Sequence, residues 1–183
     1  MIAHEVPIAG PAAEFASRLS AQLPEIRTER LRLRATTLDD FAVWADIFCG
    51  SAGPFLGGPF TRDEAFTEFC AGTGMWLLRG HGPWAVEDLS GGVLGFVLIG
   101  FEAGDQEPEL GFLFADAAQG RGYAEEAAIA ARDHALQTLK MPSLVSYTDP
   151  ANGRANRLVE RLGAVREADL GGAHVWRHAG AQV

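Results

Sequence analysis

Hydrophobic and polar positions alternate along several stretches of the chain, and this pattern predicts β-strands. In residues 30–35, RLRLRA, leucine and arginine take alternate positions, which is the period of a strand with one buried face. Leu31 and Leu33 are therefore expected to face the core. Apolar runs bounded by turn residues predict further strands, and LSGG between two of them indicates a hairpin. These strands are expected at residues 83–88, 93–100, 108–115, 143–148, 164–169 and 174–178.

Apolar residues at helical spacing predict helices between these strands. Thr61 and Glu64 have the spacing of a capping box, and Thr36 or Thr37 can cap the preceding helix. The expected helices lie at residues 11–23, 37–48, from 61 onward, 123–136 and 153–163. In the fourth of them small residues recur every three or four positions, which would let the helix lie close to a sheet. These residues are Ala124, Ala127, Ala128, Ala131 and Ala135.

The order of the predicted elements indicates one mixed α/β domain around a central sheet. It runs strand, two helices, three strands, helix, strand, helix and a final strand pair, after an N-terminal segment with a short helix. A chain of 183 residues is long enough for one such domain with a sizeable core. No repeat or low-complexity tract interrupts the order.

Charge and cysteine content narrow the functional classes. The formal net charge is −9, which argues against broad nucleic-acid binding and would suit a cationic partner or simply favour solubility. Cys49 and Cys70 form no disulfide framework, so we expect packed thiols in a reducing compartment. The chain shows neither a signal-peptide pattern nor a run of about 18 apolar residues. We expect a cytoplasmic protein without a membrane span.

A glycine turn precedes the alanine-rich helix, in the sequence QGRGYA. The residues are Gln119, Gly120, Arg121, Gly122, Tyr123 and Ala124. A helix N-terminus presents unpaired N–H groups and partial positive charge, and glycines let a phosphate approach them. The alternative is a simple turn. Glu125 stands where a dinucleotide fingerprint needs its third glycine, and the Gly-Lys-Ser/Thr of a P-loop is missing.

Four ordered segments together resemble a known family. Gln119, Gly122 and Ala124 match Q-x-x-G-x-A, the acetyl-CoA pyrophosphate loop of the GNAT N-acetyltransferases. ELGFLF…QGRGYAEEA is similar to the RimJ/RimL-like branch, which acetylates ribosomal-protein N-termini. TERLRLR, FLGGPFTRDEA and DPANGRANRLVERLGA resemble other segments of that branch. The resemblance runs from about residue 28 to about residue 178, so we expect an N-terminal arm at 1–26 and the N-acetyltransferase domain at 27–180.

The resemblance implies a fold and a cofactor site. The fold would be a GNAT-like α/β (α+β) single domain, with a mixed, mostly antiparallel sheet of about 6–7 strands splayed between the fourth and fifth. These two strands would be PELGFLFA and SLVSYT. Backbone groups of Phe112, Leu113 and Phe114 would bind the pantetheine of acetyl-CoA, and residues 119–124 would hold its pyrophosphate.

The catalytic residues are less completely matched. The related pattern implies Glu109 as general base or proton relay; the alternative is an ordinary solvated strand residue, and Glu87 is a second acidic candidate. Many members of the family use a tyrosine acid where this chain has Val159, and the branch often has serine where this chain has Ala155. We therefore consider Tyr147 as the acid, although a thiolate could also leave without one.

Other residues keep two interpretations each. Asn152 could bind the cofactor or cap the last helix, and Arg157 could reach the cofactor phosphates, whereas Arg154 is better explained by a solvated helix face. Aromatic side chains could wall the acceptor pocket or be packing residues. These are Phe55, Phe60 and Trp84. His174 and His178 lack the spacing and glutamate of a zinc motif, so we expect no metal.

The sequence therefore predicts an acetyl-CoA-dependent N-acetyltransferase acting on a primary amine, either a protein N-terminus or a small molecule. The alternative is a non-catalytic acyl-CoA sensor of the same fold. The expected partner is the amine acceptor, with no nucleic acid and no membrane. A homodimer could form through the last two strands, if these are exposed edges.

Overall fold

The computed structural model describes residues 2–179, and residue 180, the expected end of the domain, lies outside the described part. Its centre is one sheet of eight strands in the order β1-β2-β3-β4-β5-β6-β8-β7. Every neighbouring pair is antiparallel except β5 and β6, which are parallel. The strands are Ile26–Arg27 (β1), Leu31–Ala35 (β2), Pro83–Asp88 (β3), Val93–Gly100 (β4), Glu109–Phe114 (β5), Val145–Thr148 (β6), Val165–Arg166 (β7) and His174–Arg177 (β8).

The predicted mixed, mostly antiparallel α/β sheet is confirmed, with one strand that the sequence did not reveal. β1 is two residues long and pairs with β2, and such a short segment leaves no readable alternation. Leu31 and Leu33 of β2 are buried as expected. β8 lies inside the sheet between β6 and β7, so the expectation of two exposed C-terminal edge strands is wrong, and β7 alone forms that edge.

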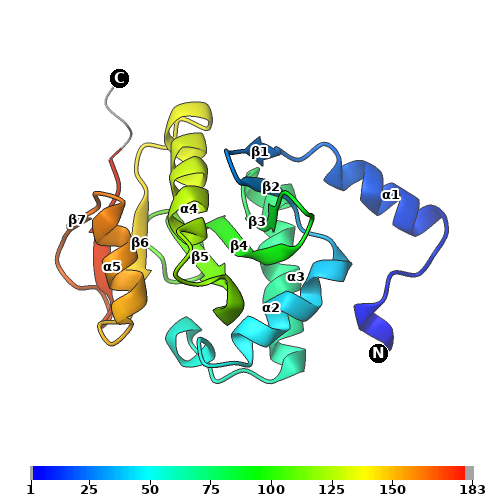
Figure 1. The fold of residues 1–183 in the computed structure, drawn as a ribbon, viewed down its shortest axis with the longest axis horizontal. Helices are drawn as coiled ribbons and strands as arrows, with labels where there is room; N and C mark the ends of the chain where they lie inside the picture. Colours follow the sequence, from blue (N-terminus) through cyan, green and yellow to red (C-terminus); the bar gives the residue numbers. More distant parts are fainter. Residues whose placement is uncertain (1, 180–183) are drawn as a thin grey trace.

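The described part of the chain contains five α-helices, four of which cover the sheet, and both threonine caps are confirmed. They are Pro11–Ser20 (α1), Phe41–Phe48 (α2), Arg62–Arg79 (α3), Tyr123–Asp133 (α4) and Gly153–Arg161 (α5). Thr61 and Glu64 form the capping box of α3, and Thr37 and Asp40 form another before α2. α4 and α5 lie on one side of the sheet, with α2 and α3 on the other (Figure 1).

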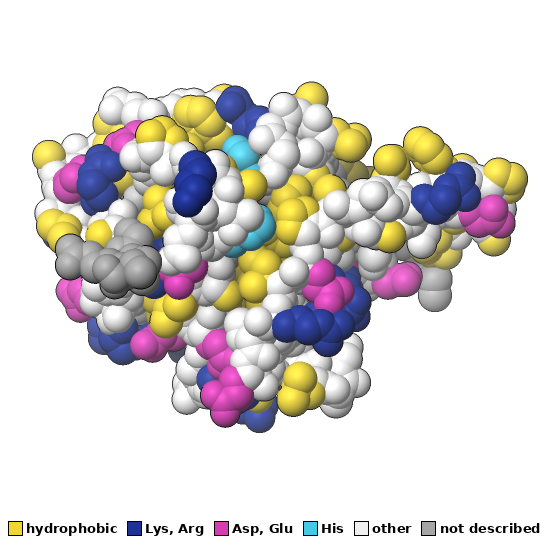
Figure 2. Space-filling view, turned by 90° about the horizontal axis from the view of Figure 1, so that it is seen from above, with side chains coloured by type: hydrophobic (Ala, Val, Ile, Leu, Met, Phe, Trp, Pro, Cys, Tyr) yellow, Lys and Arg dark blue, Asp and Glu magenta, His cyan; other side chains and the backbone are white. Residues whose placement is uncertain are grey.

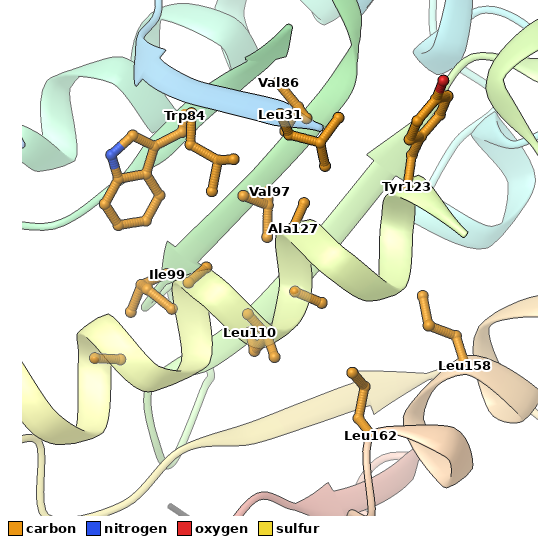
Figure 3. Packing of buried hydrophobic residues seen from close by; sticks show 14 of the residues in the cluster. Leu31, Trp84, Val86, Val97, Ile99, Leu110, Tyr123, Ala127, Leu158 and Leu162 are labelled. Atoms are coloured by element: carbon orange, nitrogen blue, oxygen red, sulfur yellow. The ribbon is translucent and has the colours of Figure 1, made fainter. Parts of the chain in front are cut away.

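The alanine stripe of α4 packs directly on the sheet. Ala127, Ala128, Ala131 and Ala135 are fully buried and belong to one cluster with apolar residues of β2 to β5. Figure 3 shows α4 crossing the strands, with Leu158 and Leu162 next to it. A larger side chain on this stripe would overpack the contact, at a cost of typically about 1–3 kcal/mol.

A second, aromatic core fills the other face of the sheet beneath α2 and α3. The Trp44 ring stacks on Phe48 with centroids 4.6 Å apart and meets Phe96 of β4 edge-on at 5.0 Å. Leu113 of β5 belongs to this cluster, whereas Leu110 belongs to the cluster under α4. Alternate residues of β5 therefore point to opposite cores.

Helix α1 stands away from this body. Figure 2 shows the N-terminal segment extending to one side, with apolar side chains on its surface. Phe15 and Leu19, which lie four residues apart on α1, are 56% and 41% exposed. Leu23 does pack against the core, and the indole N–H of Trp84 donates to the Pro24 carbonyl (2.7 Å). Cys49 and Cys70 are also exposed, so the expectation of packed thiols is wrong.

Candidate active site

The sheet opens between β5 and β6. The two strands are paired at a single position, Glu109 with Val145, where the Val145 N–H donates to the Pro108 carbonyl (3.0 Å). At the next residue of β5, the Ser146 hydroxyl replaces the backbone donor and donates to the Leu110 carbonyl (2.6 Å). Beyond this bond the recorded pairing ends, so the two strands diverge at the place the sequence predicted.

Strand alternation decides which backbone groups of β5 face the opening. The N–H and C=O of one residue point to the same neighbouring strand, and successive residues alternate. The Leu110 carbonyl faces β6, so the backbone groups of Phe112 and Phe114 face the same side, where the cleft lies. Leu113 faces β4, with which it pairs through Phe96. Of the three predicted residues, Phe112 and Phe114 are thus placed to bind a ligand through the backbone, and Leu113 is not.

A buried polar pair holds the start of this opening. The Ser146 hydroxyl lies 2.9 Å from Nε2 of His178, and both side chains are buried. Since the hydroxyl hydrogen is directed to Leu110, His178 must donate from Nε2, which leaves Nδ1 as a bare lone pair. Burial lowers the pKa of His178 to about 4, so the ring stays neutral. The pair therefore has a structural role, and Ser146 is not an activated nucleophile.

The glycine turn has a backbone conformation that favours glycine over other residues. Gly120 and Gly122 have φ angles of 72° and 79°, in the left-handed region that favours glycine. Gly122 is the N-cap of α4, so the N–H groups that follow it lie at a free helix N-terminus. Tyr123 and Ala124 contribute here through their backbone, because the Tyr123 side chain is buried in the core.

A contact from the start of β2 fixes this loop. Arg30 Nη1 donates to the Arg121 carbonyl (3.0 Å), and Arg30 Nε donates to Glu126 of α4 (2.7 Å). The guanidinium groups of Arg30 and Arg121 each lie over the Tyr123 ring, 4.9 and 4.8 Å from its centroid. Arg30 thus ties the loop to both the helix and the sheet.

Helix α5 borders the same loop from the other side of the cleft. Arg154 hydrogen-bonds to Gln119, whose amide also donates to Asp116 (2.7 Å). Asn152 is the N-cap of α5 and accepts from the Ala155 N–H (3.1 Å), which supports the capping interpretation for its carbonyl oxygen. Arg157 is exposed on α5, and its role toward the cofactor stays a prediction.

A pocket of about 830 Å³ runs from the opening to the face of α2 and α3. β5 and β6 form its floor at Glu109–Leu113 and Ser146–Thr148, and Asn152 and Ala155 of α5 border it. Trp44, Phe48 and Phe55 contribute aromatic walls, with Glu68 and Met75 on α3 and the loop at 101–105 closing the far side. This volume is in the usual range for small-molecule sites.

Glu109 occupies the position between the opening and this pocket. Its carboxylate accepts from the Tyr147 N–H (3.3 Å), and its side chain is half-buried. Burial raises the pKa of Glu109 to about 8, and the nearby charges of Asp105 and Glu102 act in the same direction, against the hydrogen bond from Tyr147. A carboxyl group with this pKa can accept a proton in mildly alkaline solution, as a general base must.

Tyr147 lines the pocket next to Glu109. Burial raises the pKa of its phenol, and backbone hydrogen bonds from Glu107 and Gln106 oppose that effect. The hydroxyl group therefore lies against the loop before β5. Its assignment as the acid stays a prediction.

Several alternative candidates are excluded by their positions. Glu87 is buried and paired with Arg34 (2.6 Å), outside the pocket lining. Trp84 is fully buried and packs edge-on against Trp76 (4.8 Å), and Phe60 packs on Phe48, so neither of the two walls the pocket. Among the described residues no group of three or more His, Cys, Asp or Glu side chains could hold a metal ion. No helix in the described range is long and apolar enough to cross a membrane.

A family model described as an acetyltransferase (GNAT) domain matches residues 30–165. The chain belongs to the GNAT family. An acetyltransferase from Agrobacterium tumefaciens str. C58 is similar to it at 34% identity and a TM-score of 0.82, over 86% of this chain and 95% of that one.

Two further GNAT structures share the fold at lower identity. One is a spermidine N-acetyltransferase from Vibrio cholerae in complex with CoA and spermine, with 20% identity, a TM-score of 0.66 and coverage of 82% of this chain and 94% of that one. The other is RimL, a ribosomal L7/L12 alpha-N-protein acetyltransferase in complex with coenzyme A. It has 14% identity and a TM-score of 0.70, over 86% of this chain and 98% of that one.

Acetyl-CoA fits this GNAT site as the cosubstrate. The backbone edge of Phe112 and Phe114 is open toward the cleft, and the glycine loop at 119–124 presents the N-terminus of α4. Both features have the donor groups that a pantetheine arm and a pyrophosphate require. Acetyl transfer is the activity that family and site together support.

Three features of the site were not predicted from the sequence. The Ser146–His178 pair joins β6 to the end of β8, 32 residues apart in the chain. The Arg30–Glu126 contact joins positions 96 residues apart. The acidic residues Glu68, Glu102 and Asp105 come from a helix and a loop with no local motif. Among these residues only Arg30 could have been singled out from the sequence, because it is the first arginine of the alternating pattern at residues 30–35.

Proposed function

We propose that this protein transfers an acetyl group from acetyl-CoA directly to a primary amine, as an acyltransferase that transfers groups other than aminoacyl groups. The observation that carries the proposal is the position of Glu109. Its carboxyl group lies at the end of β5 that is still paired with β6, and the open backbone of Phe112 and Phe114 follows on the same strand. Proton acceptor and thioester-binding edge are thus held in one rigid element.

Each residue then has a defined task. Acetyl-CoA supplies the activated carbonyl, which the backbone N–H groups of β5 would orient and polarise. Glu109, as carboxylate, would take the proton that the ammonium must lose before its nitrogen can attack. The C–N bond forms, the C–S bond breaks, and the thiolate receives a proton from Tyr147 or from water. The loop at 119–124 would hold the cofactor throughout.

The acceptor is not decided by the fold. A ribosomal-protein acetyltransferase and a spermidine acetyltransferase both have this fold. One observation supports the alternative of a non-catalytic acyl-CoA sensor. Fully buried Val159 and pocket-lining Ala155 occupy the positions at which members of the family often carry the tyrosine or serine that would act as general acid. Turnover with an amine separates the two functions.

Thiol release from acetyl-CoA tests the proposal, with a panel of primary amines and with the Glu109→Gln variant. We expect kcat to fall by roughly 10²–10⁴ in the variant, the usual contribution of a general base, while the Kd for acetyl-CoA stays unchanged. For the wild type, kcat/KM should rise with pH through an inflection near 8, where the carboxylate of Glu109 forms, and this limb should disappear in the variant.

Ionisation of the substrate amine should give a second inflection in the pH profile of kcat/KM. This inflection should move when the amine is changed, whereas the inflection of Glu109 should not. Unchanged turnover in Glu109→Gln would remove the assignment of the base. Binding of acetyl-CoA without turnover of any amine would favour the sensor.

A further inference from the structure

The lining of the 830 Å³ pocket contains acidic residues and no basic ones. Within the described part of the chain its charged side chains are Glu68, Glu102, Asp105, Glu109 and Asp149, and no Lys, Arg or His borders it. Arg79 lies close by, but its guanidinium stacks on the ring of Phe101, 4.5 Å from the centroid, and does not line the pocket. The cavity beside the proposed thioester-binding edge is therefore acidic, and its negative charge increases further when Glu109 ionises near pH 8.

These carboxylates are unpaired, in contrast to others nearby. Among the described residues no ion pair joins any of the five to a cation. Glu107, in the same loop as Asp105, is held by Arg177 at 2.7 Å, and Glu87 by Arg34 at 2.6 Å. Neither of those paired groups lines the pocket. Arginines thus neutralise these two neighbouring carboxylates, whereas those of the pocket have no countercharge.

Three of the five lie together on the side away from the cofactor cleft. Glu68 comes from α3, while Glu102 and Asp105 come from the loop between β4 and β5, where the Glu102 N–H donates to Asp105 (2.6 Å). All three side chains line the same pocket as Glu109. Burial raises the pKa of Glu102, and the charges of Asp105 and Glu68 act in the same direction. Asp149 stands at the opposite end and is occupied by the Ala151 N–H (2.7 Å).

We propose that the acceptor is a small aliphatic amine with at least one further positive charge, whose distal ammonium is held by Glu68, Glu102 and Asp105. This inference rests on the proposed acetyl transfer. The reacting nitrogen lies at Glu109, where it loses its proton, and the methylene chain crosses the apolar walls of Trp44 and Phe55. The distal ammonium supplies the countercharge that the pocket lacks. An amino acid would bring a carboxylate into the same negative space and is disfavoured.

Three amines of equal chain length test the charge requirement: putrescine, butylamine and γ-aminobutyrate. They are compared at one pH and at low ionic strength, with CoA thiol release as the readout. We expect kcat/KM for putrescine to exceed that for butylamine by about tenfold, with γ-aminobutyrate the poorest. Salt should narrow the difference, because the charges at the pocket mouth are screened.

Isosteric variants locate the effect. Glu68→Gln and Glu102→Gln should each lower the ratio of kcat/KM for putrescine to kcat/KM for butylamine about fivefold, which is the upper range for one solvent-accessible ion pair. The ratio is the readout because the charge of Glu102 also acts on the pKa of Glu109, and a change in that pKa affects both amines equally. Glu160→Gln is the matched control, since Glu160 is exposed on α5 and does not border the pocket. This control variant should leave kcat/KM unchanged for both putrescine and butylamine.

The two proposals fail in distinguishable ways. Equal kcat/KM for putrescine and butylamine would overturn the charge requirement and leave acetyl transfer intact. Acetylation of a peptide N-terminus with no preference for putrescine would do the same. If no amine is acetylated, acetyl transfer fails, and calorimetry with putrescine on the CoA-bound protein then decides the acidic subsite. Binding that weakens in Glu102→Gln keeps the subsite, and no binding removes it.

Discussion

At the scale of single residues, Glu109 shows how one strand position sets a chemical property. Odd-numbered residues of β5 point toward α2 and α3, so its carboxyl group enters the pocket instead of the alanine-lined core. There it meets Asp105, Glu102 and a single hydrogen bond from Tyr147. Since burial and like charge both favour the neutral form, the folded protein holds a proton that the unfolded chain releases.

This proton has a consequence for stability. The pKa of Glu109 is about 8 in the folded protein, above its ordinary value of 4.5, so the folded state binds more protons between these values. Stability from this group is therefore present below pH 4.5 and is lost as pH rises toward 8. Glu109→Gln cannot ionise. We expect it to be more stable than the wild type at pH 8 by on the order of 2 kcal/mol, or roughly 4–8 °C in Tm.

Thermal unfolding from pH 4 to 9 checks this expectation. The difference in Tm between Glu109→Gln and the wild type should grow across the window and level off above pH 8. Glu160→Gln, at an exposed position of α5, serves as the control and is measured over the same pH range. A constant difference for Glu109→Gln would mean that its folded pKa is ordinary.

The sequence predicted part of this residue-level picture. Glu109 and the glycine loop follow from strand alternation and the resemblance, because both are local patterns. Ser146–His178 and the Glu68, Glu102 and Asp105 group could not be predicted, since each depends on which distant segments the fold brings together. The expected packing of Cys49 and Cys70 failed for a related reason: both lie on faces of helix or loop that the fold leaves in solvent.

At the scale of elements, the loop before α4 depends on backbone conformation more than on side chains. Gly120 has φ of 72° and open space around its Cα, and Gly163 after α5 has φ of 75° and is equally open. An alanine at either position would suffer similar backbone strain, of about 1 kcal/mol. Only Gly120 lies in the proposed pyrophosphate seat.

This match gives a paired experiment. Gly120→Ala and Gly163→Ala should lower the Tm by similar amounts, whereas only Gly120→Ala should weaken acetyl-CoA binding, by about tenfold. Calorimetric titration with acetyl-CoA measures the affinity, and thermal unfolding measures the strain. Equal affinities in the two variants would show that the loop is only a turn. Gly122 is less suitable, because a Cβ there would lie 3.3 Å from Arg30 Nη2.

Elements with clear turn or cap residues at their ends were predicted from the sequence, and elements without such residues were missed. The capping box at Thr61 was predicted correctly, and so was a threonine cap before α2, which the structure places at Thr37. The strands at 83–88 and 93–100 were also predicted correctly, because turn residues lie at their ends. The short strand β1 was missed. So was the π-helical turn His134–Thr138, because the alanine pattern continues through it without interruption. Neither a two-residue strand nor a change from α-helical to π-helical hydrogen bonding alters the periodicity of the side chains, so the sequence pattern does not show them.

At the scale of the whole molecule, two cores lie on opposite faces of one sheet, and the cleft opens where β5 and β6 part. The N-terminal segment adds little to either core. No residue of α1 is buried, and the contacts before it are an ion pair of Glu5 with Arg62 (2.6 Å) and a His4–Phe66 ring contact at 4.5 Å. The first core residue is Leu23, followed by Pro24, whose carbonyl accepts the indole N–H of buried Trp84.

Two truncations should therefore differ sharply. Removal of residues 1–22 deletes no core residue, and its main loss is the partly buried ion pair of Glu5 with Arg62. We expect a loss of about 1 kcal/mol, or roughly 2–4 °C in Tm, with unchanged acetyl-CoA binding. Removal of residues 1–27 also deletes Leu23, Pro24 and strand β1. It leaves the Trp84 N–H buried without a partner, which alone costs about 1–3 kcal/mol. Thermal unfolding of both truncated chains measures the difference. Similar losses in the two would mean that α1 contributes to the core, and the domain would then begin before residue 23.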